Sequence, residues 1–92
     1  MTGETVRRRV VVHGRVQGVF FRDTARRKAA DRGVSGWVRN TPEGTVEAVF
    51  EGDGEAVACL VGYAEDGPPE AEVERVETFE EDPEGLEGFE VR

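Results

Sequence analysis

An arginine lies at the end of a glycine-containing loop in segment 12–22, which reads Val-His-Gly-Arg-Val-Gln-Gly-Val-Phe-Phe-Arg. The segment joins a run of β-branched residues to a helical pattern, so its backbone N–H groups are expected to converge near the N-terminus of a helix, where the dipole favours anions. Gly14 and Gly18 carry no Cβ, and a ligand can therefore approach the backbone closely. Arg22 adds a planar guanidinium that suits phosphate oxygens. The stretch has the chemistry of a phosphate-binding loop.

The glycine spacing differs from that of the common nucleotide-binding loops. Three residues separate Gly14 from Gly18, and Val19 follows, whereas a P-loop requires Gly-Lys-Ser/Thr after four residues. The dinucleotide pattern G-x-G-x-x-G is also absent. Taken alone, the loop could equally be an ordinary strand–helix connection whose glycines only turn the chain.

A second segment adds weight to the phosphate-binding interpretation. Residues 36–48 read Gly-Trp-Val-Arg-Asn-Thr-Pro-Glu-Gly-Thr-Val-Glu-Ala, a predicted hairpin with Asn40 at the end of its first strand. Gly-Arg-Val-Gln-Gly-Val-Phe-Phe-Arg at 14–22, Gly-Trp-Val-Arg-Asn at 36–40 and Gly-Thr-Val-Glu at 44–47 together closely resemble the acylphosphatase family. Residues 69–74 and 89–92 fit more loosely, and the resemblance extends over about residues 6–92.

The resemblance implies hydrolysis of an acyl phosphate to a carboxylate and inorganic phosphate, which would also act as an inhibitor. A carboxylate leaves without a general acid, because the pKa of its conjugate acid is only about 4. The remaining task is to stabilise charge on the phosphoryl oxygens. The resemblance assigns Asn40 to holding the attacking water in line, with a phosphoryl oxygen taking its proton. It assigns phosphoryl binding to Arg22 and to the backbone amides of Arg15, Val16, Gln17, Gly18 and Val19.

The order of predicted elements is β-α-β-β-α-β with a terminal strand, which indicates a ferredoxin-like α+β sandwich: an antiparallel sheet with two helices on one face. Strands are predicted at 6–13, 34–40, 45–51, 73–80 and 89–92, with a turn at 41–44 and a mobile loop at 81–88. Helices are predicted at about 21–32, ending at Gly33, and from a cap at Asp53 to the stop at 66–69. We expect one domain over 6–92, preceded by a short polar tail at 1–5.

The charge of the chain is unusual. The formal net charge is −8, from 20 acidic and 12 basic residues. Residues 1–40 carry 10 basic and 3 acidic side chains, whereas residues 41–92 carry 2 and 17. Such an acidic chain, with Lys28 as its only lysine, is typical of a high-salt cytoplasm, although genomic bias toward arginine and a plain acidic surface explain it equally well. With no apolar run of signal or membrane length, we expect a cytoplasmic monomer that binds no membrane.

Other candidate residues have simpler structural explanations. His13 beside the loop is expected to be structural rather than a general base, and Trp37 to pack in the core. Gln17 could donate to phosphate or only shape the loop. Cys59 is expected in the core, and the cluster of Arg26, Arg27, Lys28 and Arg32 on a solvated helix face. No His/Cys grouping has zinc spacing and no carboxylate pattern matches an EF-hand, so we expect neither metal nor cofactor.

The alternative function is a non-catalytic, anion- or nucleic-acid-binding ferredoxin-like module. Folds of this type also carry RNA recognition motifs, and the first half of the chain is basic. The aromatic pattern of an RNA-binding strand is missing from 45–50, however, and a net charge of −8 opposes nucleic-acid binding. An acyl phosphate is therefore the expected ligand, and no nucleic acid.

Overall fold

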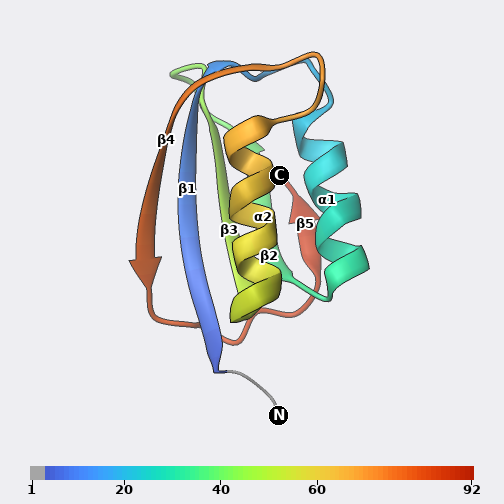
Figure 1. Ribbon diagram of the computed structural model, residues 1–92, viewed down its shortest axis with the longest axis vertical. Helices are drawn as coiled ribbons and strands as arrows, with labels where there is room; N and C mark the ends of the chain where they lie inside the picture. Colours follow the sequence, from blue (N-terminus) through green and yellow to red (C-terminus); the bar gives the residue numbers. More distant parts are fainter. Residues whose placement is uncertain (1–3) are drawn as a thin grey trace.

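A long central strand organises the fold, seen in the computed structural model of Figure 1, which describes residues 4–92. β1 (Thr5–Arg15) pairs antiparallel with a neighbouring strand on each side. Valines at alternate positions suit a strand of this kind that is covered on one face. Val10 and Val12 are fully buried on the helix side. The strand begins at Thr5, inside the expected tail, and residues 1–3 of that tail lie outside the described residues.

The remaining elements follow the predicted order closely. They are α1 (Phe21–Arg32), β2 (Ser35–Asn40), β3 (Val46–Asp53), α2 (Gly54–Asp66), β4 (Glu72–Glu81) and β5 (Phe89–Val91). Gly33 ends α1 in a left-handed conformation with φ of 67°, and the Asp53 side chain caps α2 by accepting from the Glu55 N–H. Both helices lie on one face of the sheet (Figure 1), which confirms the ferredoxin-like α+β prediction.

The sheet is mixed rather than purely antiparallel, which corrects one part of that prediction. Its strand order is β4-β1-β3-β2-β5, and β5 runs parallel to β2, with Gly36 opposite Phe89 and Val38 opposite Val91. After β4 the chain crosses to the far edge of the sheet (Figure 1) and enters β5 in the same direction as β2. Strand direction depends on this crossing, and sequence periodicity carries no information about it.

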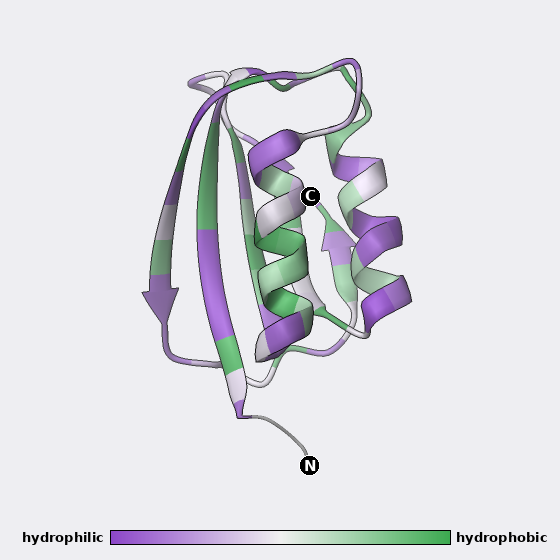
Figure 2. Ribbon diagram, in the orientation of Figure 1, coloured by the Kyte–Doolittle hydropathy of each residue, from purple (hydrophilic) through white to green (hydrophobic). Residues whose placement is uncertain are grey.

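The core lies between the helices and the sheet. Figure 2 shows green, hydrophobic positions in both helices and in the strands, and the buried ones among them form a single core cluster. Phe21, Ala25 and Ala29 are buried on α1 at four-residue spacing, as predicted. Cys59, by contrast, is exposed, so its predicted core position is wrong. The buried stripe of α2 consists of Val57, Leu60 and Ala64, and Cys59 projects away from it.

The loop before β5 is anchored to the sheet. Glu51 is only 2% exposed, on the face opposite the helices, and its carboxylate accepts from the N–H groups of Glu84, Gly85 and Leu86 at 2.9–3.0 Å. It also pairs with the buried Arg7 at 3.0 Å. These contacts tie down a segment that we expected to be mobile.

Among the described residues, no helix is long and apolar enough to cross a membrane.

Candidate active site

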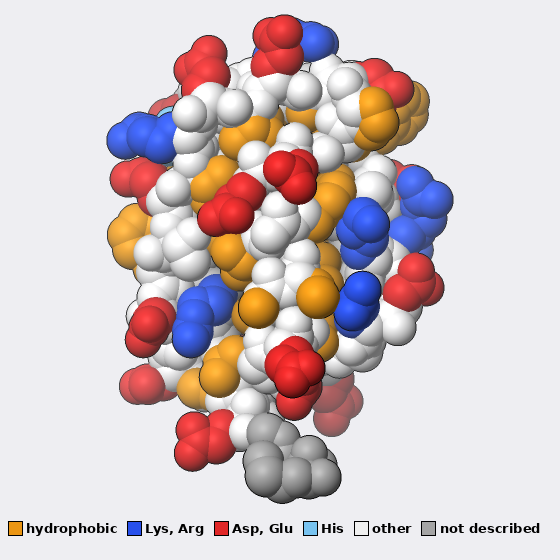
Figure 3. All heavy atoms as spheres, in the orientation of Figure 1, with side chains coloured by type: hydrophobic (Ala, Val, Ile, Leu, Met, Phe, Trp, Pro, Cys, Tyr) orange, Lys and Arg blue, Asp and Glu red, His pale blue; other side chains and the backbone are white. Residues whose placement is uncertain are grey.

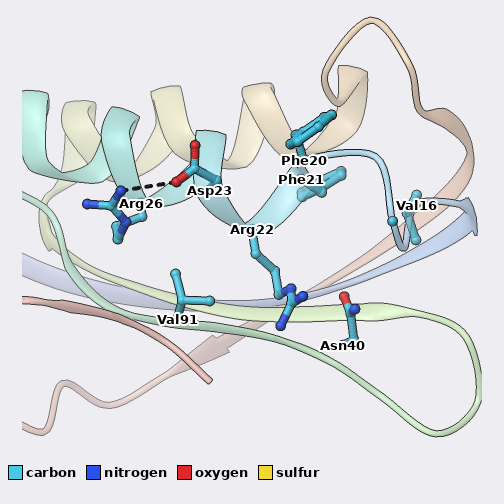
Figure 4. A pocket seen from close by; sticks show the side chains of 9 residues that line it. Val16, Phe20, Phe21, Arg22, Asp23, Arg26, Asn40 and Val91 are labelled. Carbon is cyan, nitrogen blue, oxygen red and sulfur yellow. Dashed lines mark hydrogen bonds and ion pairs between the residues drawn. The ribbon is translucent and has the colours of Figure 1, made fainter.

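A cavity of about 470 Å³ opens between the β1–α1 loop, the first turns of α1 and the ends of β2 and β5. Figure 4 shows Arg22 reaching down from α1 toward Asn40, with Val16 of the loop beside them. The lining brings together several residues singled out in the sequence: Val16, Gly18, Arg22 and Asn40. It also includes residues that sequence reasoning did not select: Phe20, Phe21, Asp23, Arg26 and Val91.

The loop that forms one wall of this cavity has an alternating backbone. Gly18 and Phe20 have positive φ angles of 74° and 64°, whereas Gln17 and Val19 do not. Such alternation turns successive N–H groups to one side and forms a concave anion-binding nest. The hydrogen bonds found among residues 4–92 include none donated by the backbone N–H groups of residues 16–20. This wall therefore offers free donors.

Gly14 marks the point where the chain leaves the regular ladder. The β1–β4 register shifts between His13 and Gly14, and Gly14 has φ of 127°. A Cβ at this position would overlap the backbone oxygen of Glu72 on β4, so only glycine fits. The resulting bulge starts the bend that carries the chain into the loop.

The start of α1 is anchored by packing. Phe21 is 2% exposed, and its ring lies 5.4 Å from the ring of Tyr63 on α2. The Tyr63 hydroxyl donates to the Phe21 carbonyl at 3.4 Å, and burial raises the pKa of Tyr63 to about 12, so the hydroxyl stays protonated as a donor. This anchoring holds the first turn of the helix, from which Arg22 projects into the cavity.

Arg22 has its guanidinium largely free. Among the described residues it forms no ion pair with a carboxylate side chain, and its Nη1 donates only to the backbone oxygen of Arg92 at 3.2 Å. The fork can therefore receive an oxyanion.

Asn40 faces the same space because of strand alternation. Val38, two residues earlier, is fully buried on the helix side of β2, so Asn40 continues that face beyond the core. Its side chain makes no hydrogen bond within the part of the chain that the structure describes. The amide can accordingly both donate and accept toward a bound molecule.

The side chain of Gln17 binds the β2–β3 turn and is not placed to donate to a phosphate in the cavity. Its Nε2 donates to the carbonyl oxygens of Thr41 and Thr45, each at 2.8 Å. Both side-chain hydrogens are thus used to connect the loop to the β2–β3 turn, and the side chain does not line the cavity. Of the two roles left open by the sequence, the contacts favour shaping the loop.

The other predicted residues lie around the cavity rather than in it. The Arg15 side chain is exposed and lies 3.7 Å from Glu72, and Val19 is 5% exposed and belongs to the core. His13 lies outside the lining, with its Nε2 2.9 Å from the Glu77 carboxylate. Trp37 is half-buried away from the helices beneath the guanidinium of Arg92, at 4.8 Å, which corrects its expected place in the core.

Helix periodicity and the position of β5 explain two of the lining residues that sequence reasoning missed, Arg26 and Val91. Arg26 is four residues after Arg22, on the same side of α1, and was interpreted only as part of a solvated cluster. Figure 3 shows that blue side chains do gather over α1. Val91 reaches the cavity because β5 lies beside β2, an arrangement that the sequence does not reveal. No group of three metal-ligating side chains is found within residues 4–92.

Comparison with known proteins supports the family resemblance throughout the chain. The family model for acylphosphatase matches residues 8–91. An acylphosphatase from Thermococcus kodakarensis is 59% identical over 86 residues, covering 94% of each chain. One from Rubrobacter xylanophilus is 60% identical over 90 residues, covering 97% of this chain and 82% of the relative. The solved structure of an acylphosphatase from Coxiella burnetii superposes with a TM-score of 0.90 at 39% identity, covering 96% of this chain and 93% of that one.

The fold, the cavity lining and these matches agree with one another. The match spans both the β1–α1 loop and the hairpin that carries Asn40. The chain belongs to the acylphosphatase family, whose members hydrolyse acyl phosphates.

Proposed function

We propose that the cavity between the β1–α1 loop, Arg22 and Asn40 is the catalytic site, and that it cleaves the P–O bond of an acyl phosphate. One observation carries the assignment: within residues 4–92, a guanidinium that pairs with no carboxylate side chain, an amide that makes no hydrogen bond and a concave row of N–H donors that lack an acceptor border the same space. That set of groups suits a phosphoryl group undergoing displacement.

Binding of the phosphoryl group is assigned to the loop and to Arg22. The backbone N–H groups of residues 15–19 donate to its oxygens, and the guanidinium fork of Arg22 donates to two of them. The loop is fixed by Gly14 and Gln17 before substrate arrives, so its dipoles need little reorganisation when charge develops.

Attack on phosphorus is assigned to a water molecule held by Asn40. The Oδ1 atom accepts one hydrogen bond from the water and orients its lone pair toward phosphorus. The new O–P bond forms as the P–O bond to the acyl group breaks. The bonding electrons leave with the carboxylate, and the water proton passes to a phosphoryl oxygen. The products are a carboxylate and inorganic phosphate, which can return to the same site as an inhibitor.

We also propose that the active unit is a monomer, because the loop, Arg22 and Asn40, to which the reaction is assigned, all come from one chain. The alternative of an anion-binding module without turnover uses the same donors, but it leaves the Oδ1 acceptor of Asn40 unused, because an anion offers that atom no hydrogen. Nucleic acid is a poorer ligand for a chain of net charge −8.

The test is hydrolysis of benzoyl phosphate in water enriched in ¹⁸O. We expect phosphate release above the spontaneous rate, with the label in phosphate and none in benzoate, since the water attacks phosphorus. Label in benzoate would indicate attack on the acyl carbon and would overturn the roles given to Arg22 and Asn40. Phosphate binding without release would favour the non-catalytic module.

A further inference from the structure

The cavity is longer than a phosphoryl group requires. From the loop, Arg22 and Asn40 it continues along α1 to Asp23 and Arg26, with Val91 on the opposite wall (Figure 4). Arg22 and Arg26 are four residues apart, so their Cα atoms are displaced by about 6 Å along the helix axis. A phosphoryl group at Arg22 leaves the part near Arg26 for the acyl group of the substrate.

The far end of the cavity retains positive charge. Arg26 donates from Nη2 to Asp23 Oδ1 at 3.0 Å, and Arg27 places its Nε 3.5 Å from the other oxygen of the same carboxylate. One acid therefore serves two guanidinium groups, which leaves one positive charge uncompensated. Arg26 is about half-exposed, at 48%, so its remaining donors are accessible.

An apolar side chain borders the space between the two cationic ends. Val91 is 42% exposed and lies across from α1 between Arg22 and Arg26 in Figure 4. A second exposed apolar side chain, Phe20 (72% exposed), lines the loop end of the cavity, beside Phe21 in Figure 4. The cavity thus has a phosphoryl-binding end, a partly apolar middle and a second cationic end.

We propose that Arg26 is a specificity-determining residue that favours acyl phosphates whose acyl group carries a second anionic group. The inference rests on the proposed function and adds a substrate class to the same site. A carboxylate on the acyl group would accept from the Arg26 guanidinium, while Val91 contacts the carbon frame between the two anions. The contact forms equally in the bound substrate and in the transition state, so it lowers KM more than it raises kcat.

Matched aromatic substrates test this selection. Benzoyl phosphate carries no second anion, 3-carboxybenzoyl phosphate carries one, and 3-carbamoylbenzoyl phosphate has a neutral group of similar shape. For the wild-type enzyme we expect kcat/KM to be higher for the carboxy compound than for the carbamoyl compound. In Arg26→Gln that ratio should fall by about two- to fivefold, the range expected for a half-exposed ion pair. The change should be in KM, and benzoyl phosphate turnover should stay near the wild-type value.

Arg27→Gln is the matched control. Arg27 shares Asp23 with Arg26 and carries the same charge, but it does not line the cavity. We expect its carboxy-to-carbamoyl ratio to remain at the wild-type value. An equal fall in both variants would show a general charge effect and overturn the assignment, as would an unchanged ratio in Arg26→Gln.

Affinity measurements with phosphonates that the enzyme cannot hydrolyse test this inference independently of the proposed function. 3-Carboxybenzylphosphonate and 3-carbamoylbenzylphosphonate cannot be hydrolysed, and calorimetry measures their affinities directly. A preference for the carboxy compound that disappears in Arg26→Gln supports the inference even if no acyl phosphate is turned over, in which case only the proposed function fails. Equal affinities in the wild type would overturn the role of Arg26 while leaving hydrolysis of benzoyl phosphate intact.

Discussion

The side-chain amide of Gln17 donates to the carbonyl oxygen of Thr41, at 2.8 Å, and so connects the β1–α1 loop to the residue directly after Asn40. A second bond of the same length reaches Thr45 on the other side of the turn. The two segments assigned to the phosphoryl group and to the attacking water are thereby held at a fixed separation. Gln17 is a positioning residue in this arrangement, since its side chain lies outside the cavity lining.

Gln17→Leu should lower both stability and turnover. Two neutral hydrogen bonds are lost, so the free energy of unfolding should fall by about 1–3 kcal/mol. Because Asn40 and the loop would no longer be held together, kcat for benzoyl phosphate should fall by about tenfold or more. Chemical denaturation and steady-state kinetics measure the two effects.

Thr45→Val is the control for that prediction. It removes the 2.6 Å bond between the Thr41 and Thr45 hydroxyls but keeps both carbonyl acceptors of Gln17. We expect a stability loss with little change in kcat. If Gln17→Leu likewise lowers stability without lowering kcat, Gln17 has no positioning role.

Arg22→Ala should abolish nearly all activity. It removes the only guanidinium assigned to the phosphoryl group, and we expect kcat/KM to fall by about 10³-fold or more. Arg22→Lys should restore little, because an ammonium cannot reproduce the planar fork. Stability should change by less than about 0.5 kcal/mol, since the side chain makes a single exposed hydrogen bond, to Arg92. Arg15→Ala, which alters an exposed side chain outside the cavity, should keep near wild-type turnover.

Asn40→Ala should separate turnover from binding. Without the amide the water loses its orientation, and we expect kcat to fall by about 10²-fold or more. The inhibition constant of inorganic phosphate should stay within about threefold of the wild-type value, because the loop and Arg22 remain. A loss of phosphate affinity as large as the loss of kcat would make Asn40 a binding residue instead.

Local sequence patterns predicted the parts of the fold that depend on neighbouring residues. The limits of α1 were correct to the residue because Phe21, Ala25 and Ala29 repeat at helical spacing and Gly33 can adopt a left-handed conformation. Asn40 was predicted at the end of its strand, and strand alternation puts it on the same face as the buried Val38, two residues before it. These two elements place Arg22 and Asn40 in the lining of the cavity.

Relationships between distant segments could not be predicted in this way. β5 lies parallel to β2 because of where the chain crosses the sheet, so Val91 in the cavity was missed. Glu51 was not singled out, since its burial depends on Arg7 and on the loop at 84–86. Gln17 was left with two possible roles because its acceptors are 24 and 28 residues away.

Glu51 should control part of the stability at low pH. Burial raises its pKa, but the N–H donors of Glu84, Leu86 and Gly85 together with Arg7 outweigh burial, so the net pKa is lowered. A carboxyl with a lowered pKa in the folded state stabilises the fold above the unfolded-state pKa of about 4.3. That contribution is lost as the pH falls from this value through the folded-state pKa.

Glu51→Gln should therefore cost about 1–3 kcal/mol at pH 7 and flatten the loss of stability below about pH 4.3. Glu81→Gln is the matched comparison, because Glu81 also pairs with Arg7, at 2.9 Å, but is 31% exposed. Its cost at pH 7 should be below about 1 kcal/mol. Urea denaturation at a series of pH values measures both, and equal costs for the two variants would contradict the role of burial.

Salt should stabilise the protein. Residues 41–92 carry 17 acidic and 2 basic side chains, and the net charge of −8 remains after every ion pair has formed. At about 0.01 M salt the Debye length is about 30 Å, so the acids repel one another throughout the domain, whereas at about 1 M it is about 3 Å. The buried Arg7–Glu51 pair is screened much less than exposed charges, so added salt removes more repulsion than attraction. We expect the melting temperature to rise with potassium chloride.

The triple variant Glu65→Gln, Glu70→Gln, Glu87→Gln removes acids that form no ion pair within residues 4–92. It should melt at a higher temperature than the wild type at low salt, and its melting temperature should depend less on the salt concentration. A melting temperature that is flat or falls with salt would mean that the acidic surface contributes to solubility alone.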